Sequence, residues 1–458
     1  MKKTFALFTL CLVLILGIVA VAAFTLHDNR DQVSVTAETL EGDPAAAQGL
    51  VAEQTFHYNY KLYWDVTIPL ADPAAASTVF TRDDSLPPDS VPDDSLSLYF
   101  PAAGFGIDSL ESWPDLMDLF LDVAARTPDG DTRLELVHPG DYMEYYPLTG
   151  DISFYNAAGE GTSLDLTPML KAFFRLPVLE RDRWLIQITK DDRGVPGYLF
   201  FHTMADAVQL STCSALADSY ALFTFGETSE PVFPDFSQVP GGFGLYRVDF
   251  APGQDGVPVL VPDSLRNVYP LPQDTWVAGL TLSPDQKEVY LLTIQGDETL
   301  CTVLDGETMA AKQTFPVPLP PPETTVTAKG TENIDLGAWE HRVSPLVKFS
   351  CGENFLCFQE DKTFHLFTRQ ADGTLGFQFT GTLTQHMPGQ SCYYNGYALA
   401  WNGEALAAAA QCQDALYLSV FDPNGALLYE GRYGNSLAQV HDSGASFLVE
   451  TPLALAWE

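Results

Sequence analysis

Four short apolar runs separated by turn signals recur three times in the C-terminal half of this chain. In the first unit the runs are Trp276–Leu282, Glu288–Ile294, Thr299–Leu304 and Thr308–Val317. The same layout returns over Val343–Leu383 and over Cys392–Tyr433. Each unit offers four strands in about 40 residues, which is the length and strand count of a β-propeller blade.

A hairpin dipeptide precedes the last run of every unit. The three dipeptides are Asp305-Gly306, Asp372-Gly373 and Asn424-Gly425. Asp-Gly and Asn-Gly provide the positive φ angles that tight hairpin turns require. A turn that recurs at one position favours a repeated blade over the alternative, a β-sandwich of unrelated antiparallel hairpins.

Weaker copies of the unit lie upstream, as the hairpins Leu245–Phe250 with Val257–Val261 and Ile152–Asn156 with Thr162–Leu166. We therefore predict an all-β, propeller-like domain of about seven blades with short helical insertions at Ser112–Arg126 and Thr167–Phe174. The last segment, Leu437–Trp457, holds only about two strands. The early strand Tyr58–Leu70 is expected to complete that unit, which would remove a free sheet edge.

An unbroken apolar run, residues 5–24, follows Lys2 and Lys3. About 20 apolar residues in a helix match the roughly 30 Å hydrocarbon core of a bilayer. Positive charge precedes the run and shows no excess after it, which predicts a single-pass transmembrane helix with the C-terminal bulk extracytoplasmic. The alternative is a signal sequence cleaved near Ala22, which gives a secreted protein.

These signals divide the chain into three parts. Residues 1–26 are predicted to be a transmembrane anchor or signal sequence, 27–50 a flexible spacer, and 51–458 the extracytoplasmic propeller-like domain. The chain has 60 acidic and 23 basic residues and a net charge of -37. That balance argues against nucleic-acid binding, because phosphate recognition requires clustered Lys and Arg.

Six cysteines follow the apolar run, an even number that permits disulfides in an exported protein. Cys351 and Cys357 flank a turn and could meet across one hairpin. Cys392 and Cys412 bracket two strands of one unit. The alternative is that these thiols are buried as small hydrophobic side chains, because a domain of this size needs no covalent cross-links.

Three tyrosines, Tyr142, Tyr145 and Tyr146, lie close together in the tract Asp141–Leu148. Such a group could form a platform on which a carbohydrate stacks or a peptide docks. Strand alternation would turn Tyr142 and Tyr145 to opposite faces, so ordinary packing is the alternative interpretation.

No pattern in the sequence specifies a reaction. The chain lacks a G-x-S-x-G elbow, a P-loop and a dinucleotide fingerprint, and its histidines show no metal-binding spacing. We therefore predict no catalytic, cofactor-binding or metal-binding residue and no cofactor, and we favour a role without catalysis.

Three features of the chain carry a resemblance: the spacer followed by Glu53–Phe56, the tripeptide Tyr63-Trp64-Asp65, and the tract Asp141–Leu148. In these features the chain resembles uncharacterised, N-terminally anchored exported proteins of Gram-positive anaerobes. That resemblance implies an anchored, propeller-like protein and brings no activity with it. We expect a membrane-tethered extracytoplasmic module that binds, senses or scaffolds at the cell envelope. The alternatives are an extracytoplasmic hydrolase acting on carbohydrate and an accessory subunit of an envelope protein complex. The expected partners are the lipid bilayer, through residues 5–24, and an envelope protein or carbohydrate ligand.

Overall fold

The structure is a computed structural model of the whole chain. It describes residues 33–58, 62–82, 94–99, 114–155, 161–203, 212–225, 234–253, 257–321, 323–331, 334–343, 347–360, 362–383, 397–412, 415–437, 448–449 and 453–458. The predicted span at residues 5–24 and the cleavage point near Ala22 lie outside these ranges. No helix in the described ranges is long and apolar enough to cross a membrane.

The first predicted repeat unit is a four-stranded antiparallel meander. Its strands, which pair in chain order, are β16 (Trp276–Leu282), β17 (Glu288–Gln295), β18 (Glu298–Asp305) and β19 (Ala311–Val317). The middle strands are buried on both faces, whereas β19 alternates between exposed and buried residues towards its end. Neighbouring sheets cover both faces of a middle strand, so its sequence is an almost continuous apolar run.

Two further meanders repeat this unit. The strands of one are β22 (Val347–Cys351), β23 (Phe355–Glu360), β24 (Thr363–Arg369) and β25 (Leu375–Thr382), and those of the other are β26 (Tyr397–Trp401), β27 (Leu406–Gln411), β28 (Leu416–Phe421) and β29 (Leu427–Asn435). In all three units the fourth strand carries one extra residue at the same place, namely Lys312, Gln378 and Leu428. A β-bulge of this kind sharpens the twist and re-aims the side chains beside it.

The N-terminal sheets are less regular. Their strands are β2 (Leu50–Tyr58), β3 (Leu62–Pro69) and β4 (Ser77–Arg82); β5 (Ser95–Tyr99), β7 (Thr149–Tyr155) and β8 (Gly161–Asp165); β6 (Thr132–Val137), β9 (Trp184–Lys190) and β10 (Pro196–Thr203); and β11 (Thr212–Leu216), β12 (Tyr220–Phe225), β13 (Gly244–Pro252), β14 (Pro258–Leu260) and β15 (Arg266–Pro270). The helices are α2 (Pro114–Ala125) and α3 (Thr167–Phe173), which confirms both predicted insertions, with the short 3-10 turns η1 (Pro44–Ala47), η2 (Pro73–Ala75) and η4 (Pro139–Asp141).

The two ends of the chain share sheets. β1 (Val35–Gly42) pairs with β29, so the last meander gains a fifth strand from the N-terminal side. β30 (Leu448–Val449) and β31 (Ala454–Trp457) pair with β2, whereas the strand predicted to complete the last unit corresponds to β3, the next strand of the same sheet. Residues 27–50 are predicted to be a flexible spacer, but the ladder between β1 and β29 places 35–42 inside the folded domain.

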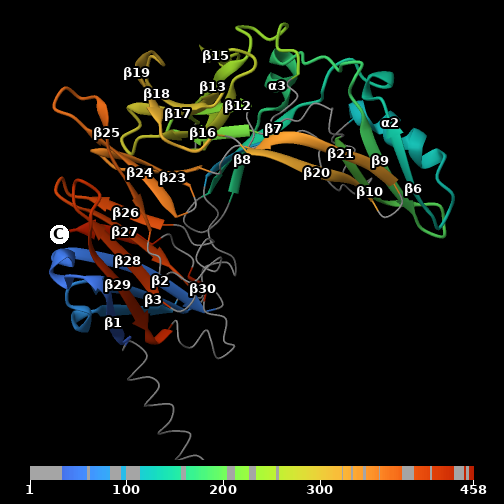
Figure 1. The fold of residues 1–458 in the computed structure, drawn as a ribbon. Coiled ribbons are helices and arrows are strands. Elements are labelled where there is room, and N and C mark those ends of the chain that lie inside the picture. Colours follow the sequence, from blue (N-terminus) through green and yellow to red (C-terminus); the bar gives the residue numbers. More distant parts are fainter. Residues whose placement is uncertain are drawn as a thin grey trace, which may run out of the picture.

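The described strands form seven sheets of three or more strands and one two-stranded hairpin, β20 (Glu323–Thr331) with β21 (Ile334–Val343). Successive sheets follow one another along an arc (Figure 1), and the first strands β11, β16 and β22 contact one another in turn. The prediction of an all-β, propeller-like domain of about seven blades is confirmed.

Hydrophobic cores fill the boundaries between neighbouring sheets. Phe315 and Phe358 belong to the core between the β16–β19 and β22–β25 meanders. Phe364 and Phe421 belong to the next core, with ring centroids 5.2 Å apart. Each boundary is therefore a packed layer of side chains from two blades, and polar residues at its rim are held in place by both.

Candidate functional site

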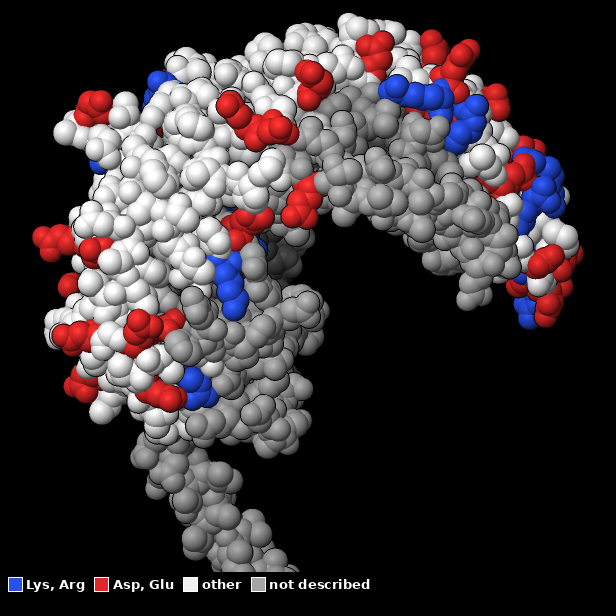
Figure 2. Space-filling view, viewed as in Figure 1, with Lys and Arg blue, Asp and Glu red and all other residues white. Residues whose placement is uncertain are grey.

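A cavity of about 640 Å³ lies at the rim of the boundary between the β16–β19 and β22–β25 meanders. The turns β16–β17 and β22–β23 and the ends of β19 and β24 surround it. Three acidic and three basic residues line it, namely Asp285, Glu288, Glu353, Lys287, Lys312 and Arg369. Acidic side chains are more frequent than basic ones on the face that Figure 2 shows.

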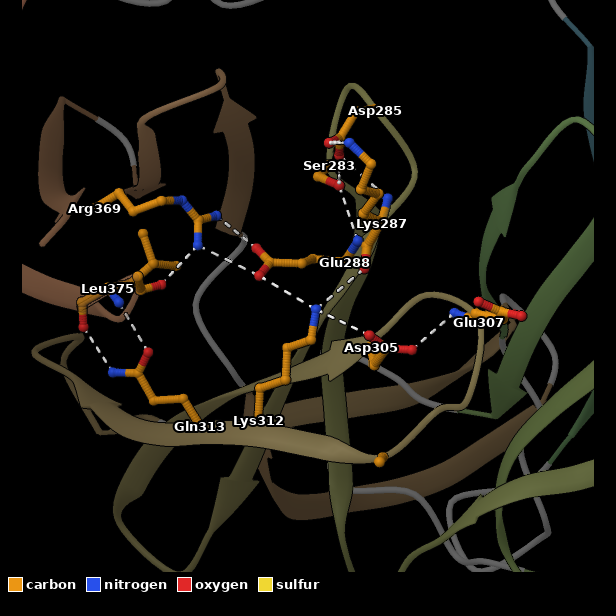
Figure 3. A network of polar contacts seen from close by, with 12 residues as sticks. Ser283, Asp285, Lys287, Glu288, Asp305, Glu307, Lys312, Gln313, Arg369 and Leu375 are labelled. Carbon is orange, nitrogen blue, oxygen red and sulfur yellow. Dashed lines mark hydrogen bonds and ion pairs between the residues drawn. The ribbon is translucent and has the colours of Figure 1, made fainter. Parts of the chain in front are cut away.

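Glu288 and Arg369 form the centre of this site and join the two blades (Figure 3). Arg369 donates to both carboxylate oxygens of Glu288, with Nη2 2.6 Å from Oε2 and Nη1 3.3 Å from Oε1. Tyr290 donates its hydroxyl to Oε2 at 3.0 Å. The Glu288 side chain is only 13% exposed. A two-pronged, charge-assisted pair in such a position fixes the orientation of both side chains.

The environment of Glu288 favours its charged form. Burial opposes ionisation, but the hydrogen bonds from Arg369 and Tyr290 and the charges of Arg369 and Lys312 outweigh it, so the pKa of Glu288 lies below its usual range. The same hydrogen bonds with Glu288 raise the pKa of Arg369. Both groups are therefore fully charged at neutral pH.

Lys312 is the bulge residue of β19, and it extends the network to a second carboxylate. Its Nζ lies 3.1 Å from Asp305 Oδ2 and 3.7 Å from Glu288 Oε1. The pKa of Asp305 lies far below its usual range because Asp305 accepts hydrogen bonds from the Thr308 backbone and from Lys312. The bulge is the local feature that directs Lys312 toward the cavity.

The outer rim of the cavity is exposed. Lys287 Nζ lies 2.8 Å from Asp285 Oδ2, with the two side chains 78% and 54% exposed. Hydrogen bonds from Lys287 and Ser283 hold the pKa of Asp285 far below its usual range. Glu353 is exposed on the turn between β22 and β23. A ligand entering the cavity would meet this exposed rim before the fixed Glu288–Arg369 pair.

The three tyrosines predicted as a platform lie away from this cavity, and one of them, Tyr146, is buried. Tyr142 follows the turn η4, and its hydroxyl donates to Asp122 Oδ2 of α2 at 2.6 Å. Tyr145 carries the Arg175 guanidinium 5.7 Å from its ring centroid. The tract forms a 3-10 turn and an isolated bridge rather than a strand, so simple alternation of side chains does not apply.

Tyr146 is a core residue. It is 3% exposed, its ring lies 6.4 Å from that of Trp184, and its hydroxyl donates to the buried Asp182. Burial and the Asp182 carboxylate raise the pKa of Tyr146. The structure therefore supports the packing alternative for Tyr146, and its ring is not available to a ligand.

The predicted disulfide between Cys351 and Cys357 is wrong, because both thiols are free. In the β22–β23 ladder Cys351 pairs with Leu356 and Cys357 pairs with Ser350. Neighbouring residues on a strand point to opposite faces, so this register places the two thiols on opposite sides of the sheet. Cys351 accordingly packs in one boundary core and Cys357 in the other.

The other predicted pair is described only in part. Cys412 is disulfide-bonded, while Cys392 lies outside the described residues. A bond between the two therefore stays a prediction. Cys213 and Cys301 are free, and burial raises the pKa of both thiols.

No sequence pattern marks Glu288, Lys312 or Arg369 as a site. They come from β17, β19 and β24, and only the packing of two blades brings them together. The one available signal is that Glu288 begins a predicted strand and Arg369 lies three residues before the Asp372-Gly373 turn. Within the described ranges no group of three or more His, Cys, Asp or Glu residues is placed to hold a metal ion.

No family model matches this sequence, and no curated protein matches it. Among solved structures, the periplasmic gluconolactonase of Pseudomonas aeruginosa is 12% identical, over 84% of this chain and 99% of its own, with a TM-score of 0.32. A provisionally named 6-phosphogluconolactonase of Bacteroides uniformis is 14% identical, over 83% and 95%, with a TM-score of 0.32. The β-propeller domain of a Myceliophteria thermophila protein is 11% identical, over 66% and 86%, with a TM-score of 0.26. These TM-scores are low, and the fold assignment stands on the strand topology.

Proposed function

We propose that this chain is a binding module of the cell envelope, anchored in the membrane by residues 5–24, with the cavity between the β16–β19 and β22–β25 meanders as its ligand site. The observation that supports this proposal is the charge-balanced lining of that cavity. Three cations and three anions converge there in a chain whose net charge is -37. Fixed charges of both signs suit a polar ligand that itself carries both signs.

The charge states of the lining residues favour recognition over acid–base catalysis. The pKa values of Glu288 and Asp285, and of the neighbouring Asp305, are lowered, and those of Lys287 and Arg369 are raised. A general acid or base works best when its pKa is near the working pH, and these shifts move each group away from neutrality. The lining therefore presents permanent charges, which suit a binding site.

The ligand would be a component of the envelope that reaches the outer side of the membrane. Muropeptides are suitable probes, since their peptide stems carry both amino and carboxylate groups. A cavity of about 640 Å³ is in the range of small-molecule sites.

Calorimetric titration of the detergent-solubilised full chain with muropeptides tests this proposal. Arg369→Gln keeps the size of the side chain and removes its charge, and we expect it to weaken binding at least tenfold. Arg266→Gln is the matched control, because Arg266 forms a similar pair with Asp249 at 2.6 Å in another sheet. The proposal fails if wild type binds no muropeptide. It also fails if Arg369→Gln binds muropeptide as tightly as wild type and the Arg266→Gln control do.

A further inference from the structure

β1, the first described strand, shows at which end of the last blade the chain enters the domain. β1 runs antiparallel to β29, with Val35 opposite Asn435 and Gly42 opposite Tyr429. The turn between β28 and β29 lies at the Gly42 end, where the backbone N–H of Asp43 donates to the Leu428 carbonyl at 3.0 Å. The chain therefore enters at the opposite end, where Ser34 and Ser436 are hydrogen-bonded.

The cavity lies on the face that carries the β28–β29 turn. Gln378 of β25 donates to the Pro423 carbonyl in that turn at 2.7 Å. Gln313 of β19 in turn forms two hydrogen bonds with the backbone of Leu375, the first residue of β25. These contacts join equivalent ends of three successive blades, so their corresponding turns, and the cavity among them, lie on one face of the arc.

Chain lengths decide whether this face can approach the membrane. β1 has eight residues, so a strand length of about 27 Å separates the two faces. The roughly nine residues from Phe24 to Val33 could reach roughly 30 Å at full extension. A flexible coil of that length averages only about 17 Å. Turning the cavity face toward the bilayer would require almost the whole extended length of the segment from Phe24 to Val33.

We infer that the cavity opens on the membrane-distal face and takes a water-borne or wall-borne ligand of mixed charge, not a lipid headgroup. This inference rests on the proposed anchor. The side of the domain opposite the cavity faces the bilayer, and Asp285, Lys287 and Glu353 are the first charges that an approaching ligand meets.

Energy transfer in reconstituted vesicles tests the orientation. The full chain is inserted into vesicles of phosphatidylcholine and phosphatidylglycerol that contain a headgroup-labelled acceptor. A thiol-reactive donor is attached at Lys287→Cys on the cavity face or at Glu298→Cys on the opposite face of the same blade. Both positions are exposed. Wild type, with its half-buried Cys213 and Cys351, gives the background labelling.

We expect the protein to float with the vesicles and the donor at position 298 to transfer energy more efficiently than the donor at position 287. Equal or reversed efficiencies in floating protein would overturn the orientation while leaving the anchor intact. Protein that stays at the bottom of the gradient would remove the anchor, and the orientation with it. Flotation is scored separately from energy transfer, so the two failures are distinguished.

Discussion

The three C-terminal meanders and the N-terminal sheets are built from the same kind of strand but are connected differently. Each C-terminal meander is one continuous stretch of chain whose strands pair in sequence order. In the N-terminal half, β6 pairs with β9, while β7 and β8 lie in another sheet. Closing a long loop costs entropy before any contact forms, so the N-terminal pairings depend more heavily on their side-chain core.

Aromatic rings fill part of the core in both regions. Phe174, Phe223, Phe225 and Tyr246 form a continuous group of ring contacts in the N-terminal half. In the C-terminal half Phe367 forms similar contacts with Phe315 and Phe358, although β27 of the last meander is largely alanine. The regions therefore differ mainly in how their strands are connected, and the N-terminal pairings, which close longer loops, are expected to depend more on their rings.

The largest expected effect comes from removing a ring at the centre of the N-terminal core. Phe174 is 2% exposed, and Phe174→Ala should destabilise the fold by about 3–5 kcal/mol. Phe367→Ala is the matched control in the C-terminal half, where Phe367 contacts Phe315 and Phe358. Hydrogen exchange measured by mass spectrometry should show protection lost first in the N-terminal sheets for Phe174→Ala. Uniform loss of protection in both variants would contradict the proposed difference between the regions.

A second prediction concerns the boundary beneath the cavity. Gly279 of β16 is buried, and a Cβ there would lie 2.1 Å from the Phe349 ring of β22. Gly279→Val should therefore cost about 3 kcal/mol, through overpacking between two blades. Gly373→Ala meets no atom within 4 Å and should cost about 1 kcal/mol, for the left-handed backbone alone. Chemical denaturation measures both, and equal costs would show that the boundary is easily deformed.

A smaller effect is expected from the ion pair that joins the two regular blades. Glu288→Gln should cost about 1.5 kcal/mol at neutral pH, since it removes a charge-assisted pair. The folded pKa of Glu288 is lowered, so its contribution is complete above the unfolded pKa of about 4.3 and is lost as pH falls through the folded pKa. The difference between wild type and variant should therefore be constant from pH 7 to about 5 and shrink below about 4. A difference independent of pH would rule out this electrostatic origin.

The smallest effect is expected at the exposed rim of the cavity. Lys287 pairs with Asp285 in full contact with solvent. Exposed pairs of this kind contribute little to folding, so Lys287→Ala should leave the thermal midpoint at the wild-type value. The same variant should weaken muropeptide binding, which separates a role in recognition from a role in stability. A lowered midpoint would show that the rim also holds the two blades together.

Much of the fold could be predicted because its units are local. The runs Trp276–Leu282 and Glu288–Ile294 match β16 and β17 closely, and the helices α2 and α3 begin within two residues of their predicted starts. The four strands β9 to β12 follow one another along the chain, but β9 and β10 belong to one sheet and β11 and β12 to another. Strand signals reveal where strands form, whereas the choice of partner depends on contacts far away in sequence.

The site shows the same limit. A one-residue offset in the β22–β23 ladder separates Cys351 from Cys357, and no spacing rule reveals that offset. Arg369 meets Glu288 across 81 residues of chain, because two complete blades pack side by side.

The sequence alone determined the repeated four-strand unit and its hairpin turns, because periodicity and turn chemistry act between neighbouring residues; the anchor stays a prediction. Tertiary structure decided that β1 adds a fifth strand to the last blade, that Tyr146 is buried, and that six charged residues converge on one cavity. Those outcomes depend on register and on packing between blades, and both are set by residues distant in the chain. The repeated unit is thus fixed locally, while the site between two of its copies exists only in the folded domain.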